Sequence, residues 1–217
     1  MYFIRHYLRF SSKTDTLMAK ALPTTESVSS DDELVKSRIE NGRYVNSFNR
    51  DFKMPGYATI LRWMVGAPNN TRLPATIEEL NTVLPVLTPN PAEIWKTTPG
   101  LRFTWIGHAS CLVQMDDFMF ITDPLFGDRC GITPMIGPKR YRPPALTVPD
   151  LPEQLEAVVI SHSHFDHLDE PSVRSLNARY GDKLTWFCGQ GLGQWFSNCG
   201  MQKVIELDWW GEWTHPV

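Results

Sequence analysis

Three histidines and an aspartate fall within six consecutive positions of the chain, directly after a short apolar run. They are His162, His164, Asp166 and His167, and the apolar run is 158–160. Imidazole and carboxylate are the usual ligands of catalytic zinc, and such zinc sites leave one position open for water. The pattern therefore predicts a metal site, although these donors also suit iron or manganese. The alternative is a polar loop with solvated histidines.

The elements around these residues must place the donor atoms together. Residues 158–160 are β-branched and bounded by polar residues, which is typical of a buried strand. Side chains at i and i+2 of an extended backbone point the same way, so His162 and His164 can reach one ion. A helix is expected to begin near 169–173.

Short strands are expected before this loop, and strands that alternate with helices after it. Tight strand–turn–strand spacing predicts antiparallel hairpins. The expected strands are 101–106, 111–115, 118–122, 184–187 and 203–207, and the expected later helices are 171–180 and 192–199. This order predicts an α+β fold, an αβ/βα sandwich with the metal loop at its edge.

The chain before this fold divides into two expected segments. Residues 1–56 are predicted to be a variable, partly helical or disordered extension, with one short helix at 33–40. Residues 57–99 are predicted to be a helical segment that precedes the main domain, because 57–65 is strongly apolar with helical spacing. Residues 100–217 then form the domain that carries the metal loop.

Composition limits the partners and the compartment. The net charge is −3, so no basic field points to nucleic acid. The four cysteines form no C-x-x-C pair, which favours free thiols in a reducing compartment. No apolar run approaches the roughly 18 residues that span a bilayer. We expect an intracellular protein, cytosolic or peripheral on an internal membrane.

The metal loop has the form of a known signature. The segment 162–169 reads HSHFDHLD and resembles the H-x-H-x-D-H signature of the metallo-β-lactamase superfamily. Further matching motifs follow the same order along the chain, at 104–109, 122–126, 137–142 and 206–210. Together they resemble the N-acylphosphatidylethanolamine-hydrolysing phospholipase D family, over roughly 62–210.

The resemblance implies a dinuclear zinc hydrolase. It assigns His162 and His164 to one zinc ion and Asp166 and His167 to the other, and it gives Asp166 the further task of orienting a bridging hydroxide. The implied reaction is zinc-dependent cleavage of N-acylphosphatidylethanolamine to N-acylethanolamine and phosphatidic acid. The implied fold of 100–217 is the N-terminal half of a metallo-β-lactamase domain.

The resemblance also implies supporting residues. It places Asp123 and His108 near the metal site without coordinating metal; the alternatives are a turn-forming aspartate before proline and a merely packed or exposed histidine. Substrate contacts are expected from the five residues Lys139, Arg140, Arg142, Trp209 and Trp210. A solvated loop for the cations and core packing for the tryptophans are the alternatives. The implied partners are a phospholipid, a membrane surface and a second copy in a homodimer.

The end of the chain departs from the family pattern. The family has a further histidine, a bridging aspartate and a last histidine after the segment 206–210, whereas here only His215 follows it. We therefore expect a C-terminally truncated chain that alone binds zinc weakly and lacks hydrolase activity. Two other functions stay open: a metallo-β-lactamase-fold hydrolase of a soluble ester or phosphodiester, and a non-catalytic isoform that acts as a binding partner.

Overall fold

The computed structural model describes residues 34–66, 72–131, 133 and 135–214. The chain forms two compact units, one from Met1–Asn70 with Leu207–Val217 and the other from Thr71–Glu206. The segment boundaries expected at residues 56 and 99 stay predictions. No helix in the described parts of the chain is long and apolar enough to cross a membrane.

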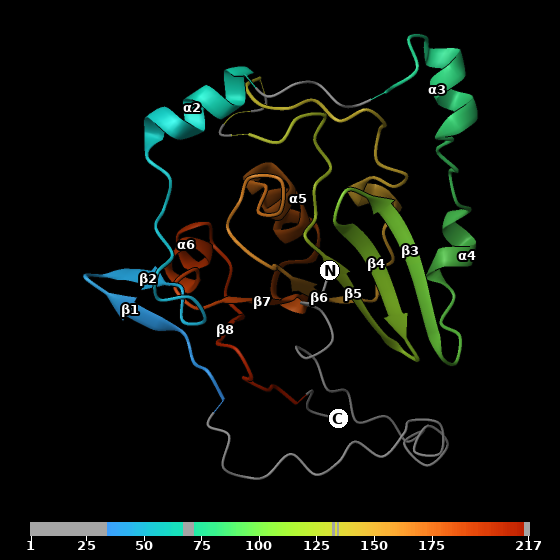
Figure 1. Ribbon diagram of the computed structural model, residues 1–217. Helices are drawn as coiled ribbons and strands as arrows, with labels where there is room; N and C mark the ends of the chain where they lie inside the picture. The colour runs from blue at the N-terminus through green and yellow to red at the C-terminus, as the bar shows by residue number, and fades with distance from the viewer. Residues whose placement is uncertain (1–33, 67–71, 132, 134, 215–217) are drawn as a thin grey trace, which may run out of the picture. The chain divides into compact units, whose positions relative to one another are not determined.

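The larger unit is built on a sheet whose strands follow one another in the order of the chain (Figure 1). The first three strands pair antiparallel, whereas β5, β6 and β7 pair parallel. The strands are β3 (Leu101–Gly107), β4 (Ser110–Met115), β5 (Phe118–Thr122), β6 (Leu155–Val159), β7 (Thr185–Gly189) and β8 (Val204–Leu207). Helices connect the later strands, so the expected mixed α+β fold is confirmed.

Two of these helices cover the sheet. Helix α5 (Glu170–Tyr180) links β6 to β7, and α6 (Gly193–Asn198) links β7 to β8. Asp169 caps α5 by accepting a hydrogen bond from the backbone N–H of Ser172, which is why the helix begins directly after the metal loop. The remaining elements of the unit are α3 (Ile77–Val83), α4 (Pro91–Trp95) and the 3₁₀ turns Val148–Asp150 and Gly181–Lys183.

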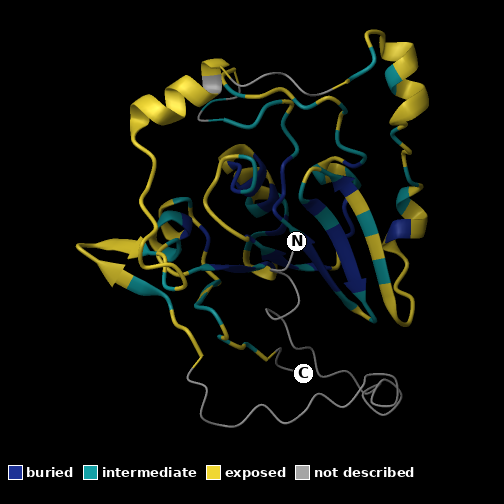
Figure 2. Ribbon diagram, in the orientation of Figure 1, coloured by how far each residue is buried: buried dark blue, intermediate teal, exposed yellow. Residues whose placement is uncertain are grey.

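The hydrophobic core lies between the sheet and these helices. Figure 2 shows the central strands as buried, whereas β3 alternates between exposed and intermediate residues. The fully buried side chains from the sheet include Ile121, Val158 and Trp186, and those from the helices include Leu176 and Phe196. Burial of this apolar surface is the main stabilising contribution, at about 25 cal/mol per Å².

The topology brings several strand ends to one edge of the sheet. Because β3 and β5 both run antiparallel to β4, they run in the same direction, and β6 is parallel to β5. The segments after Gly107, Thr122 and Val159 therefore emerge side by side. This edge carries every residue of the metal site described below.

The smaller unit contains a hairpin and a helix. Strands β1 (Arg38–Glu40) and β2 (Arg43–Val45) pair antiparallel across Asn41-Gly42, whose φ angles are 51° and 74°. The prediction of a short helix at 33–40 is wrong, because residues 38–40 form strand β1. A two-residue Asn-Gly turn of this kind favours a hairpin. Helix α2 (Tyr57–Gly66) agrees with the apolar helix expected at 57–65.

Two buried groups of the larger unit hold their protons unusually tightly. Burial raises the pKa of Tyr180 to about 12, with Glu153 adding to the shift and Arg179 opposing it. Burial also raises the pKa of the Cys188 thiol to about 12, and Glu206 adds to it. Their ordinary values are about 10 and about 8.5, so the unfolded chain ionises first as the pH rises.

We expect the stability of the protein to fall between about pH 9 and pH 12. The contribution of both groups is intact below their unfolded pKa values and is lost as the pH approaches their folded values. The loss near pH 10.5 is on the order of 3 kcal/mol for the two groups together, most of it from Cys188. Urea midpoints at pH 8 and pH 10.5 measure the loss. The Cys188→Ala variant should lose less than the wild type, and an equal loss in both proteins would contradict this account.

Candidate metal centre

Asp123 joins the end of β5 to the end of β6. Its backbone N–H donates to the Val159 carbonyl oxygen at 2.9 Å, which continues the parallel pairing. Its buried carboxylate accepts hydrogen bonds from Ser161 N (2.7 Å), from Ser161 Oγ (2.7 Å) and from His167 Nδ1 (2.8 Å). Because Nδ1 of His167 is held by a carboxylate, its Nε2 lone pair is left available for a metal.

The metal loop folds the three histidines of the motif toward one another. The rings of His162 and His164 have centroids 4.6 Å apart, and those of His162 and His167 are 4.1 Å apart. The backbone N–H of His167 donates to the His164 carbonyl oxygen at 2.9 Å, so the loop closes in a turn. Ser161 Oγ lies 2.9 Å from His162 Nδ1, which orients that ring.

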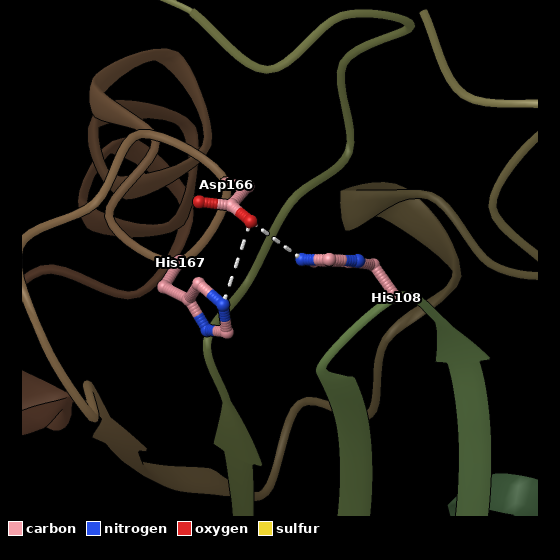
Figure 3. A group of neighbouring side chains, drawn as sticks. All are labelled: His108, Asp166 and His167. Carbon is pink, nitrogen blue, oxygen red and sulfur yellow. Dashed lines mark hydrogen bonds and ion pairs between the residues drawn. The ribbon is translucent and has the colours of Figure 1, made fainter. Parts of the chain in front are cut away.

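His108 reaches this loop from the turn between β3 and β4. Its Nε2 lies 3.1 Å from Asp166 Oδ2, and the same oxygen lies 3.6 Å from His167 Nε2 (Figure 3). One donor atom from each of these three residues falls within 4.8 Å of the others. Asp166 Oδ2 therefore lies between two imidazoles, one from the metal loop and one from the turn between β3 and β4.

Burial and charge favour the protonation states that bind metal. Burial lowers the pKa of His162, and the neighbouring His167 and His164 lower it further. Burial raises the pKa of Asp166, but its own backbone N–H, His167 and the His108 hydrogen bond outweigh that effect, so its pKa lies below the ordinary value. Neutral imidazole and ionised carboxylate are the forms that coordinate divalent metals.

The donor set fits a divalent metal ion. It consists of nitrogen and oxygen ligands with a buried carboxylate behind one histidine, which is the usual environment of catalytic metal in proteins. The assignment of His162 and His164 to one ion and of Asp166 and His167 to another stays a prediction, as does zinc as the metal.

The three predicted phosphate contacts do not share one environment. Lys139 is exposed and Arg142 is half-buried. Arg140 is directed inward, and its Nη1 donates to the backbone carbonyl oxygens of Leu125 (2.8 Å) and Gly127 (3.3 Å). The Arg140 side chain therefore binds protein backbone, whereas phosphate contacts by Lys139 and Arg142 stay predictions.

Both predicted tryptophan contacts lie in the smaller unit. The Trp209 ring packs against Phe48, with centroids 4.9 Å apart. Trp210 Nε1 donates to the Val35 carbonyl oxygen at 2.9 Å. These contacts give both side chains a local packing role, and substrate contact by either stays a prediction. His215, the later histidine, lies outside the described residues.

Two serines support the site without being predicted from the sequence. Ser161 binds Asp123 through both its backbone and its hydroxyl. Ser110 is fully buried, donates to the Asp123 carbonyl oxygen at 2.8 Å and accepts from Leu125 N at 2.9 Å. In the sequence, each serine stands close to a histidine at the end of an expected strand. Serine is so common at such positions that this alone does not predict a role at the site.

Comparison with known proteins agrees with this geometry. The family model for the Beta-lactamase superfamily domain matches residues 119–217. The chain is 34% identical over 197 residues to N-acyl-phosphatidylethanolamine-hydrolyzing phospholipase D 1 of Caenorhabditis elegans, covering 87% of this chain and 54% of that protein. It is 30% identical over 107 residues to the mitochondrial N-acyl-phosphatidylethanolamine-hydrolyzing phospholipase D of Saccharomyces cerevisiae, covering 49% of this chain and 22% of that protein.

The solved structures that match part of this chain include a metallo hydrolase from Ignicoccus hospitalis, at a TM-score of 0.36 and 21% identity over 49% of this chain and 39% of that one. This chain spans about half the length of the nematode relative. Residues 119–217 match the beta-lactamase superfamily domain, and the histidine-rich loop beside Asp123 lies within this match.

Proposed function

We propose that this chain carries the metal loop of a zinc-dependent phosphodiester hydrolase of the phospholipase D type. The proposed substrate is N-acylphosphatidylethanolamine, and the products are N-acylethanolamine and phosphatidic acid. The observation that carries the proposal is the 34% identity, over 87% of this chain, to a nematode protein named for that reaction. The match of residues 119–217 to the beta-lactamase superfamily domain supports it.

The reaction joins a water oxygen to phosphorus and breaks the bond from phosphorus to the ethanolamine oxygen. That oxygen leaves with a proton as N-acylethanolamine. Zinc, when bound, supplies a water of lowered pKa and positive charge for the phosphate oxygens. His162, His164, Asp166 and His167 would hold the metal, and Asp166 would also orient the attacking water. Asp123 would keep His167 in the tautomer that leaves Nε2 free.

We further propose that the protein meets its lipid substrate from the membrane surface. Helix α2 exposes Tyr57, Leu61, Trp63 and Val65, of which Tyr57 is 93% and Val65 is 81% exposed. Aromatic and aliphatic side chains of this kind suit the boundary between head groups and acyl chains. We propose that the protein binds an internal membrane peripherally and forms a homodimer. We do not propose nucleic acid as a partner.

The position of bond cleavage tests the proposed reaction. The complete product of the gene is incubated with N-acylphosphatidylethanolamine vesicles and zinc in ¹⁸O-labelled water, and the lipids are analysed by mass spectrometry. We expect N-acylethanolamine and a phosphatidic acid that carries one ¹⁸O, with at least a 100-fold loss of rate in His164→Ala. Arg174→Ala, which removes an exposed ion pair with Glu170, is the control that should keep the rate.

Other products would overturn the proposal. Diacylglycerol would place the cut on the other side of phosphorus, and free fatty acid would indicate an amide or ester hydrolase. Hydrolysis of a soluble phosphodiester, lactone or thioester, with none of the vesicle substrate, would favour a different hydrolase of the same fold.

A further inference from the structure

We infer that His108 is a positioning residue for the Asp166 carboxylate and that Arg140 holds the turn on which His108 sits. The inference rests on the proposed function in so far as Asp166 serves a bound metal. According to this inference, two residues outside the metal loop, His108 and Arg140, hold the Asp166 Oδ2 atom in position.

The turn between β3 and β4 has an unusual backbone. Gly107 has a φ of 140° and His108 has a φ of 50°, so His108 occupies the left-handed region, which is uncommon for residues other than glycine although histidine tolerates it better than most. The strand register also shifts between Trp105 and Gly107. Residues held in such conformations persist where surrounding contacts fix them, and they concentrate at functional sites.

Several contacts fix this turn. Trp105 Nε1 donates to the His108 carbonyl oxygen at 2.9 Å, and Ala145 N donates to the Ile106 carbonyl oxygen at 2.9 Å. The Arg140 guanidinium packs directly against Gly107, where an added Cβ would lie 2.9 Å from Nη2. A side chain at position 107 would therefore displace Arg140.

Arg140 connects the turn to the loop after β5. While its Nη2 faces Gly107, its Nη1 donates to the carbonyl oxygens of Leu125 and Gly127, and its backbone N–H donates to Asp128 at 2.9 Å. One guanidinium thus ties together two segments at the site edge of the sheet. A lysine ammonium lacks the planar fork that makes these contacts together.

The outcome of this arrangement is the contact between His108 and Asp166. The Nε2–H of His108 donates to Asp166 Oδ2 at 3.1 Å, and His108 comes from a different strand connection than the loop that holds Asp166 (Figure 3). The hydrogen bond restricts the rotation of the carboxylate, so that its oxygen stays beside His167 Nε2. Such partners of ligating carboxylates usually raise metal affinity by about 10–100-fold.

Three variants separate the hydrogen bond from the backbone of the turn. His108→Asn suits the left-handed conformation but is too short to reach Asp166, whereas His108→Gln keeps a donor near the position of Nε2. Arg140→Lys keeps histidine at position 108 but removes the guanidinium that holds the turn. Zinc affinity is measured by competition with a chromophoric chelator, and Co²⁺ absorption spectra report the ligands around the metal.

We expect His108→Asn and Arg140→Lys to weaken zinc binding by about 10-fold or more, while His108→Gln stays within about threefold of the wild type and the Co²⁺ spectrum keeps its intensity. Wild-type affinity in His108→Asn would overturn the inference. An equal loss in Gln and Asn variants, with a Co²⁺ spectrum altered as in His167→Ala, would also overturn it, because His108 would then be a ligand itself.

A measurement on metal-free protein distinguishes this inference from the proposed function. With ¹⁵N-labelled histidine and a chelator present, we expect a protected Nε2 proton of His108 in the wild type that is absent in Asp166→Ala. If the wild type binds no zinc, the proposed function fails while this signal still supports the contact. If zinc binds but the signal is the same in both proteins, the inference fails and the proposed function stands.

Discussion

Asp123→Ala should lower zinc affinity by about 100-fold and the free energy of unfolding by about 3–5 kcal/mol. The carboxylate is 5% exposed and accepts three hydrogen bonds from two residues, Ser161 and His167. Removing it leaves the Ser161 backbone N–H, the Ser161 hydroxyl and the His167 Nδ1 without their acceptor at a part-buried site. Each such group costs about 1–3 kcal/mol.

The loss of affinity follows from the loss of orientation. Without Asp123, His167 can rotate or adopt the other tautomer, and the start of the metal loop is no longer tied to β5. Asp123→Asn should give an intermediate result, because the amide oxygen can still accept from Ser161 N while the amide N–H₂ cannot accept from His167. Chelator competition measures the affinity, and urea unfolding measures the stability.

Asp116→Ala is a matched control for this variant. Asp116 also has a positive φ of 54°, compared with 34° at Asp123, and it also accepts a backbone hydrogen bond, from Gly100 N at 2.8 Å. It lies in the turn between β4 and β5, at the other end of the sheet from the metal loop. Its variant should lose some stability and keep its zinc affinity. Equal zinc affinities in Asp123→Ala and Asp116→Ala would contradict the role given to Asp123.

The second large effect is expected from the double variant His162→Ala/His164→Ala. In the wild type, zinc at 100 times its dissociation constant should stabilise the folded state by about 2.7 kcal/mol, and a chelator should reverse this. The double variant lacks two of the four predicted donors, so zinc should leave its thermal midpoint unchanged. Calorimetry with and without zinc and chelator measures both midpoints.

The same loop supplies the control for that variant. Ser163 and Phe165 alternate with the histidines, and both are exposed. The double variant Ser163→Ala/Phe165→Ala changes neighbouring positions without removing a predicted donor, so zinc should stabilise it as it does the wild type. Loss of the zinc effect in this control would mean that loop conformation, and not the imidazoles, accounts for the change.

Much of the fold was predictable because its signals are local. The β-branched run 158–160 overlaps the end of β6, and the short alternating segments became the hairpin strands β3–β5. The helix expected at 33–40 was wrong because the left-handed pair Asn41-Gly42 is compatible with a hairpin turn, and the preceding residues 38–40 pair as a strand. A charge-rich segment of that length has a weak helical preference that pairing overcomes.

The contacts across the site were less predictable because they depend on topology. His108 and Asp166 are separated by 58 positions, and they meet only because β3, β5 and β6 end at one edge of the sheet. Arg140 shows the same limit: a run of cations resembles an exposed phosphate site in sequence, whereas the structure directs this guanidinium to backbone carbonyls. Ser161 became a partner of Asp123 through the same strand order.

If the loop from His162 to His167 is a metal site, the purified chain should hold metal through these histidines. Elemental analysis is carried out on the wild type and on His162→Ala/His164→Ala after equal exposure to zinc and removal of free metal. We expect bound zinc in the wild type, at less than two ions per chain because the expected site is incomplete, and a loss of most of it in the variant. Equal zinc in both proteins, or none in the wild type, would show that the loop does not hold metal.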